Sequence, residues 1–229
     1  MDIEFTIRNS SWWRDAEQAA DLHYDESSGI TLEHHLEAVY QNLRFLQPFA
    51  GRHAYFAQLV PALENIGIDP AYALRLLTPV ALLHDIGKTK EDKNLVGPHP
   101  LSGKMVEMRH PIVGVVAALE LLPTELDERA VILALIEEHD TPYAWFRQFV
   151  RTQQIPKRKT WAQLDRRIEA RGDGTGLALL AIFKLADIDG HENVDDVLWF
   201  FEKANQNFLS EAGKALPVPD REAVESLKT

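Results

Sequence analysis

Apolar residues recur at three- and four-residue spacing along most of the chain, which is the period of an amphipathic helix. Period-two alternation is limited to a short run near Ile3 to Ile7. The pattern predicts an all-α protein with about eight or nine helices. The predicted helices span Thr31 to Leu46, His53 to Ile66, Pro70 to Asp85, Ile112 to Leu122, Glu125 to His139, Tyr143 to Gln153, Trp161 to Ala170, Gly176 to Asp189 and Val194 to Leu209.

Cap and turn residues mark several helix ends. Thr31 precedes an apolar-periodic segment, and Asp69 places a capping side chain before a proline at the first helical position. Gly87 is the expected stop of the helix that contains His84. The stretch from Thr89 to Arg109 is rich in glycine and proline and is the longest segment expected to be irregular, and such loops are usually functional or mobile.

One helical domain is the simplest organisation for this pattern. The only candidate boundary is the segment from Thr152 to Thr160, and a candidate site residue, Asp187, lies beyond it. We therefore expect a helical domain over residues 31–210, preceded by an N-terminal arm of residues 1–30 packed on the core. Residues 211–229 are expected to form a C-terminal tail.

Composition narrows the classes of function. The 229 residues are 45% hydrophobic and 26% charged, as in ordinary globular proteins. The formal net charge of −11 argues against a nucleic-acid partner, and the apolar stretches are too short for a bilayer, so no membrane partner is expected. Without cysteine, any metal must be held by histidine and carboxylate, and this composition fits a cytoplasmic location.

The pair His84-Asp85 is the centre of the candidate chemistry. Leu77, Val80 and His84 share one helical face, so the imidazole emerges from the core side at the end of an apolar helix. An adjacent imidazole and carboxylate can bind one ion together, and the second carboxylate oxygen can reach another ion or a water. For an isolated pair, a core histidine with internal hydrogen bonds is the commoner explanation.

Further polar residues adjoin apolar helical faces elsewhere in the chain. Such groups are costly to bury unless they are paired or bound to metal. They are His34 in a predicted early helix, His110 at a helix start, His139 at a helix end, and Asp187 within an apolar run. His99 also precedes a Pro-x-x-Gly sequence, but glycine and proline surround it, and we interpret it as a loop residue.

These residues resemble the HD superfamily of metal-dependent phosphohydrolases, whose pattern is a His, then His-Asp, and a distant Asp, with two intervening His in the two-metal branch. The resemblance covers Thr31 to about Asp189, and its most specific parts are Leu-Leu-His-Asp-Ile-Gly-Lys and His-Pro-x-x-Gly. It implies two divalent-metal sites bridged by Asp85. The first would be held by His34, His84, Asp85 and Asp187, and the second would be completed by His110 and His139.

Two positions depart from the pattern. His34 and His35 are neighbours, and His34 is preferred because Glu33-His34 followed by Leu36 matches the superfamily's Glu-His-x-Leu register. Asp140 follows His139 where some relatives have a second His, which weakens assignment to the cyclic-dinucleotide phosphodiesterase branch.

The resemblance implies hydrolysis of a phosphomonoester or phosphodiester by metal-activated hydroxide. Asp85 and Lys88 are the expected catalytic residues, with Lys88 contacting the phosphate. The expected partner is a small phosphorylated substrate such as a nucleotide. The predicted ligands could hold one or two divalent ions, and the ligand types alone do not indicate whether these are Fe, Mn, Co, Ni, Mg or Zn. The sequence also gives no indication of the oligomeric state. The alternatives are an HD-fold di-iron oxygenase acting on a small organic substrate and, third, a non-catalytic signalling module.

Overall fold

The computed structural model describes residues 2–20, 29–47, 53–188 and 194–228, and this part of the chain is essentially all-α. The predicted fold class is therefore confirmed. Within the described residues the only sheet is one antiparallel pair of short strands. The main helices are α3 (Leu32–Asn42), α4 (Ala54–Asn65), α5 (Pro70–Leu83), α6 (His110–Leu121), α7 (Arg129–Glu138), α8 (Thr141–Thr152), α9 (Arg158–Ile168), α10 (Thr175–Ala186) and α11 (Val194–Ala204).

Two long predicted helices change their winding near the C-terminal end. The α3 helix continues as a 3-10 turn, η2 (Leu43–Leu46), and α11 continues as a π-helical turn, η4 (Asn205–Leu209). The predicted start at Asp69 is observed, because its side chain accepts a hydrogen bond from the Ala71 amide at 3.0 Å.

The N-terminal segment is helical where its pattern alternates. The run from Ile3 to Ile7 belongs to α1 (Ile3–Arg8), in which the Asp2 side chain accepts a hydrogen bond from the Phe5 amide at 3.1 Å. A second short helix, α2 (Ser11–Ala16), begins at a Ser10 cap. A run this short matches both periods, and the capping residues favour the helix.

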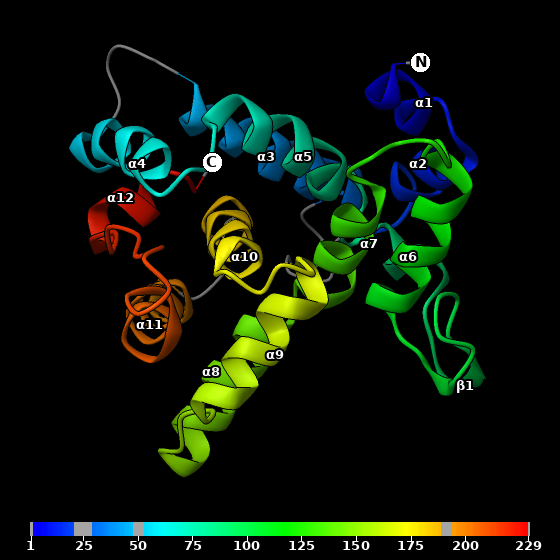
Figure 1. The fold of residues 1–229 in the computed structure, drawn as a ribbon. Coiled ribbons are helices and arrows are strands. Elements are labelled where there is room, and N and C mark those ends of the chain that lie inside the picture. Colours follow the sequence, from blue (N-terminus) through cyan, green and yellow to red (C-terminus); the bar gives the residue numbers. More distant parts are fainter. Residues whose placement is uncertain (1, 21–28, 48–52, 189–193, 229) are drawn as a thin grey trace.

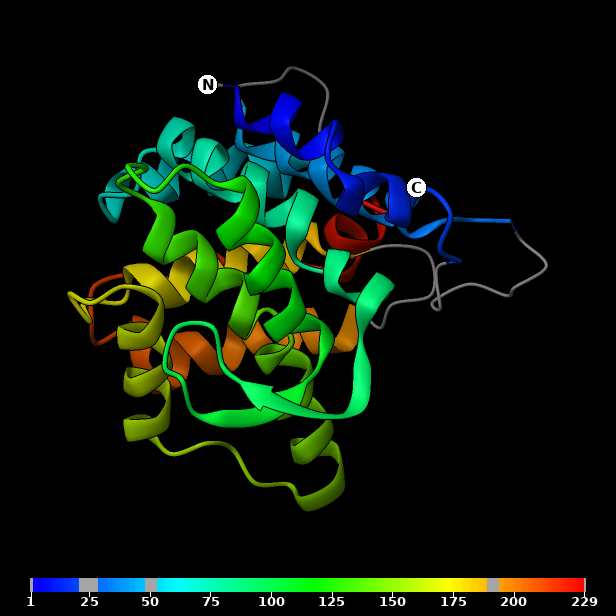
Figure 2. The same ribbon diagram turned by 90° about the vertical axis from the view of Figure 1, so that its right-hand side faces the viewer.

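The segment from Thr89 to Arg109 is more ordered than predicted. It begins within η3 (Ile86–Lys90), a 3-10 turn, and continues as an antiparallel hairpin of β1 (Asp92–Pro98) and β2 (Met105–Met108), interrupted by a bulge between Asp92 and Val96. Figure 2 shows this hairpin lying beside α6. Much of the hairpin's surface is exposed, so the buried-exposed alternation that normally reveals a strand is weak in the sequence.

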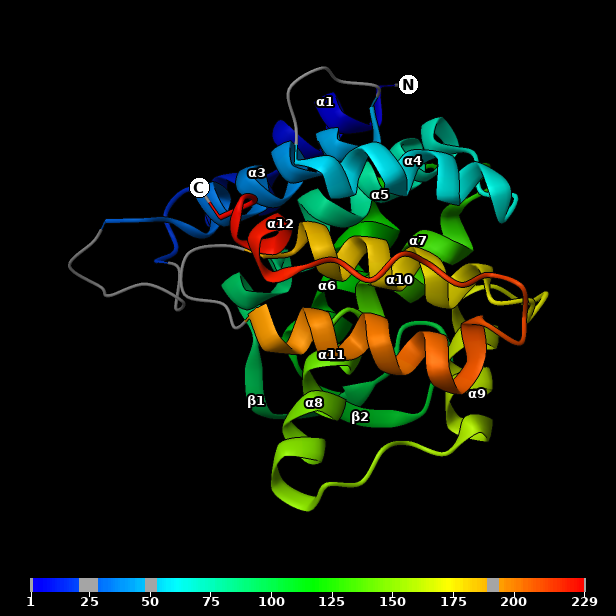
Figure 3. The same cartoon turned by 90° about the vertical axis from the view of Figure 1, so that its left-hand side faces the viewer.

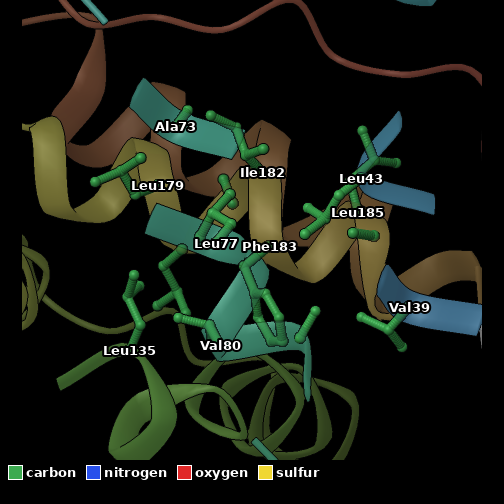
Figure 4. Packing of buried hydrophobic residues seen from close by; sticks show 14 of the residues in the cluster. Val39, Leu43, Ala73, Leu77, Val80, Leu135, Leu179, Ile182, Phe183 and Leu185 are labelled. Atoms are coloured by element: carbon green, nitrogen blue, oxygen red, sulfur yellow. The ribbon is translucent and has the colours of Figure 1, made fainter. Parts of the chain in front are cut away.

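The α10 helix is the centre of the fold. Every one of its residues is buried, as expected for a helix that is apolar on nearly all sides, and Lys184 is its one charged residue. It packs against α3, α5, α7, α9 and α11, and Figures 1 and 3 show it between these helices. Figure 4 shows Leu77 and Val80 of α5 packed beside Phe183 of α10.

Both ends of the chain pack on this core. Trp12 and Trp13 are buried in the same hydrophobic cluster as α10, and Trp12 Nε1 donates a hydrogen bond to Glu120 Oε2 at 2.7 Å. Near the other end, Ala223 and Val224 of α12 (Arg221–Glu225) join that cluster. Within the described residues no single helix is long and apolar enough to cross a bilayer; only α4 taken with Pro70–Lys90, bent by 107°, meets that length and composition criterion.

Candidate metal site

Helix ends bring together the histidines and aspartates of the candidate site. His84 is the C-cap of α5, His139 the C-cap of α7, and Asp187 the C-cap of α10. His110 is the first residue of α6, and Asp85 lies between α5 and η3. A side chain at a helix end leaves the packed helix surface, so the site forms where several helices terminate around one point.

The first group of side chains is deeply buried. His35 Nε2 lies 3.2 Å from His84 Nε2, 3.4 Å from Asp85 Oδ2 and 3.6 Å from Asp187 Oδ1. His84 Nε2 lies 3.2 Å from the same Asp187 oxygen. Two imidazoles and two carboxylates therefore converge on one small volume.

The second group uses the other oxygen of Asp85. Asp85 Oδ1 lies 3.3 Å from His110 Nε2 and 3.3 Å from His139 Nε2. On the outer side, Asp140 Oδ2 lies 3.1 Å from His110 Nε2. Asp85 thus faces one group with each carboxylate oxygen, which is the arrangement expected of a bridging ligand.

Backbone carbonyls orient two of the imidazoles. A carbonyl oxygen accepts hydrogen bonds only, so His84 Nδ1 donates to Ala81 O at 3.0 Å, and His139 Nδ1 donates to Ile136 O at 2.7 Å. When these rings are neutral, their Nε2 atoms carry the lone pairs and face the cluster. Such a hydrogen bond on the far nitrogen is the usual support of a metal-binding histidine.

The donor atoms fit one or two divalent cations. Asp85 Oδ1 and His110 Nε2 are buried and have no hydrogen-bond partner among the described residues, although each has polar atoms nearby. Ligands about 2.1 Å from a shared ion lie roughly 3.0–3.4 Å from one another. The separations of 3.2 to 3.6 Å in the first group and 3.3 Å in the second are close to that range. A cation would satisfy the buried oxygen and nitrogen for which this part of the chain offers no hydrogen bond.

The electrostatic field of the cluster shifts the pKa values of its members. Burial opposes the charged form of Asp85, but Lys88 and His84 outweigh it and hold the pKa of that carboxyl well below its usual range. Burial likewise opposes charging of His139, yet Asp140 and Asp85 raise its pKa to about 9. Burial dominates at His84 and lowers its pKa. These shifts describe ionised carboxylates that attract positive charge.

The first histidine of the site is His35, which corrects the sequence-based choice. His34 is exposed on α3, whereas His35 is 1% exposed and faces His84. Helical spacing explains the difference, because Leu32, His35, Leu36 and Val39 follow the three- and four-residue period of the buried face. That period is visible in the sequence and favours His35, whereas the Glu-His-x-Leu register of the resemblance favours His34.

The other predicted residues lie at or near the cluster. His84, Asp85, His110, His139 and Asp187 converge as expected, and Lys88 Nζ lies 2.5 Å from Asp85 Oδ2. His99 is not in the cluster: it is buried in the hairpin turn, with Nε2 3.1 Å from Glu137 Oε1.

The cluster has a closed side and an open side. The side chains of His35 and His84 have no exposed surface, whereas those of Lys88 and His110 are 15% and 16% exposed and that of Asp140 is 50% exposed. Among the described residues, the second group is therefore more accessible to solvent than the first.

Comparisons with known proteins identify no relative. No protein-family model, no curated protein and no solved structure matches the chain.

Proposed function

We propose that this protein is a metal-dependent phosphohydrolase of the HD type that cleaves a phosphate ester of a small molecule such as a nucleotide. The observation that carries the proposal is the position of Asp85. One of its oxygens faces His35 and His84, and the other faces His110 and His139. A carboxylate shared in this way suits two ions held close together, an arrangement typical of enzymes that hydrolyse phosphate esters.

Divalent ions held there supply Lewis acidity and lower the pKa of bound water toward neutrality. The chain itself supplies orientation. The carbonyls of Ala81 and Ile136 hold the His84 and His139 rings with Nε2 facing inward. Ligand rings fixed before binding lose little freedom when an ion binds, which favours tight and specific coordination.

Lys88 adds a positive charge beside the shared carboxylate. Its ammonium contacts Asp85 Oδ2, and its side chain reaches the partly exposed side of the site. An ammonium in this position can hydrogen-bond a phosphate oxygen and stabilise negative charge that develops on it during hydrolysis.

The balance of charge supports an anionic substrate. The carboxylates of Asp85, Asp140 and Asp187 outnumber Lys88, so the metal-free site is negative when its histidines are neutral. Two divalent ions would reverse that sign and attract phosphate to a site in a chain of net charge −11. The small exposed area of Lys88 and His110 favours a small substrate over a polymer.

The test is release of inorganic phosphate from a panel of nucleotides and sugar phosphates, with Mn²⁺, Fe²⁺, Co²⁺, Ni²⁺, Mg²⁺ or Zn²⁺ added to metal-free protein. His35→Ala should lower the rate at least ~100-fold, because it removes a buried ligand. His34→Ala is the matched control, since this neighbouring ring is exposed, and it should retain the wild-type rate.

Two results would replace the proposal. Oxygen uptake by the iron-loaded protein with an organic substrate, in the absence of phosphate release, would assign the same ligands to a di-iron oxygenase. Only trace metal after loading, together with unchanged behaviour of His84→Ala in the cell, would assign a non-catalytic signalling role.

A further inference from the structure

Asp140 occupies an unusual position at the start of α8. It is the N-cap residue of that helix, and aspartate at an N-cap normally accepts a hydrogen bond from an amide in the first turn. Here the side chain makes no capping hydrogen bond. Its two oxygens instead face the second group, with Oδ2 3.1 Å from His110 Nε2 and Oδ1 3.6 Å from His139 Nε2.

A direct hydrogen bond does not account for this approach. In the part of the chain that the structure describes, buried His110 Nε2 makes no hydrogen bond, even though oxygens of Asp85 and Asp140 lie 3.3 and 3.1 Å away. The same holds for Asp85 Oδ1. A ring nitrogen and carboxylate oxygens that lie this close without good hydrogen-bond geometry can serve as ligands of a common cation.

We propose that Asp140 is the fourth ligand of a second cation, together with Asp85, His110 and His139. This inference rests on the proposed function and deepens it by completing the second site. Asp140 Oδ2 lies 3.1 Å from His110 Nε2, which is within the roughly 3.0–3.4 Å expected of atoms that share an ion, and Asp140 Oδ1 lies 3.6 Å from His139 Nε2, slightly beyond it.

The junction between α7 and α8 holds Asp140 in place. Glu138, two residues earlier, accepts a hydrogen bond from Thr141 Oγ1 at 2.7 Å. It also forms an ion pair with Arg167, in which Nε lies 2.6 Å from Glu138 Oε1. These contacts tie the turn that carries His139 and Asp140 to α9. A ligand on such a braced turn loses little conformational freedom on binding.

The added carboxylate makes the two sites chemically alike. Each then offers two imidazoles and two carboxylates, with Asp85 common to both. Oxygen-rich sites favour harder cations such as Mn²⁺ relative to sites built from nitrogen or sulfur.

The experiment titrates metal-free, full-length protein with Mn²⁺ by calorimetry and records electron paramagnetic resonance spectra at each step. The wild type should bind two ions and show the spectrum of a coupled Mn²⁺ pair. Asp140→Asn keeps the side-chain shape, and it should raise the dissociation constant of the second ion at least ~10-fold and leave that of the first within about twofold. Asp127→Asn, an exposed aspartate before α7, is the control and should match the wild type. Thermal unfolding of each metal-free variant checks that it is folded.

The outcomes separate this inference from the proposed function. Two ions bound equally well by wild type and Asp140→Asn would overturn the role of Asp140 and leave the binuclear site intact. A single ion in the wild type, unaffected by Asp140→Asn, would also overturn it. No binding of Mn²⁺ or Zn²⁺ by the wild type would remove the proposed function as well.

Discussion

Replacing Gly87 with alanine should test how the fold sets the distance between the two halves of the metal site. Gly87 lies in η3, directly after the segment that carries His84 and Asp85, and it abuts the start of α6. A Cβ atom there would lie 2.2 Å from His110 O and 2.6 Å from Gly114 N. Both are backbone atoms of α6, so a side-chain rotation cannot relieve the collision.

The size of the expected destabilisation follows from the overlap between the added Cβ atom and the backbone of α6. Because an ordinary contact of this kind is about 3.4 Å, η3 and α6 must separate by roughly 1 Å, which carries His110 away from Asp85. Overpacking of this severity costs about 3 kcal/mol, or a fall of roughly 6–12 °C in the melting temperature for a chain of this length. Gly87 is not among the glycines with positive φ, so the collision, rather than backbone strain, should dominate the cost.

Two other glycines calibrate the measurement, which is urea unfolding of metal-free protein. At Gly114 a Cβ would meet Ile136 Cγ2 at 3.1 Å and His84 O at 3.2 Å, so alanine should cost about 1 kcal/mol. At Gly97 the nearest atoms, at 3.2 and 3.3 Å, belong to the flexible Met108 side chain, and the cost should be within about 0.5 kcal/mol. A Gly87→Ala protein as stable as Gly97→Ala would refute the reasoning.

Three further predictions concern buried charges. Metal-free wild type should lose stability as the pH rises from about 6.5 to about 9, because the pKa of His139 is about 9 in the folded state and lower in the unfolded state. The proton that stabilises the folded state is lost across that pH range. In urea unfolding at several pH values, the stability of His139→Gln should depend less on pH in this range. Asp165→Ala should destabilise the protein by about 1–3 kcal/mol in the same assay, because the buried carboxylate accepts hydrogen bonds from the Gly174 and Leu177 amides at 2.9 and 2.8 Å. An unchanged stability would show that water takes over the hydrogen bonds of the carboxylate. Lys184→Ala should lower the free energy of unfolding by about 3–5 kcal/mol, because the buried Lys184 Nζ lies 3.4 Å from Asp196 Oδ2 and its removal leaves that carboxylate unpaired. The double variant Lys184→Met with Asp196→Leu should recover most of that loss, because it replaces both charges with apolar groups. Equal losses in the single and double variants would contradict this account of the pair.

Local sequence determined most of the helical framework. The spacing of apolar residues and caps such as Asp69 placed the main helices within a few residues of their observed bounds, because these signals act within one or two turns. The uncharged apolar stretch from Thr175 to Phe183 is also evident in the sequence, and it forms most of the buried helix α10. The resemblance of short motifs pointed to His84, Asp85, His110, His139 and Asp187, which the structure brings together.

Tertiary structure decided what one-dimensional patterns do not encode. The apolar period of α3 favours His35 over His34, but only the packing of distant helices places the His35 ring beside His84. Asp140 looked like a departure from a motif until the ends of α7 and α8 placed it beside His110. The physical reason is that a ligand set forms where distant helix ends meet, and that meeting depends on close packing such as the contact of Gly87 with α6.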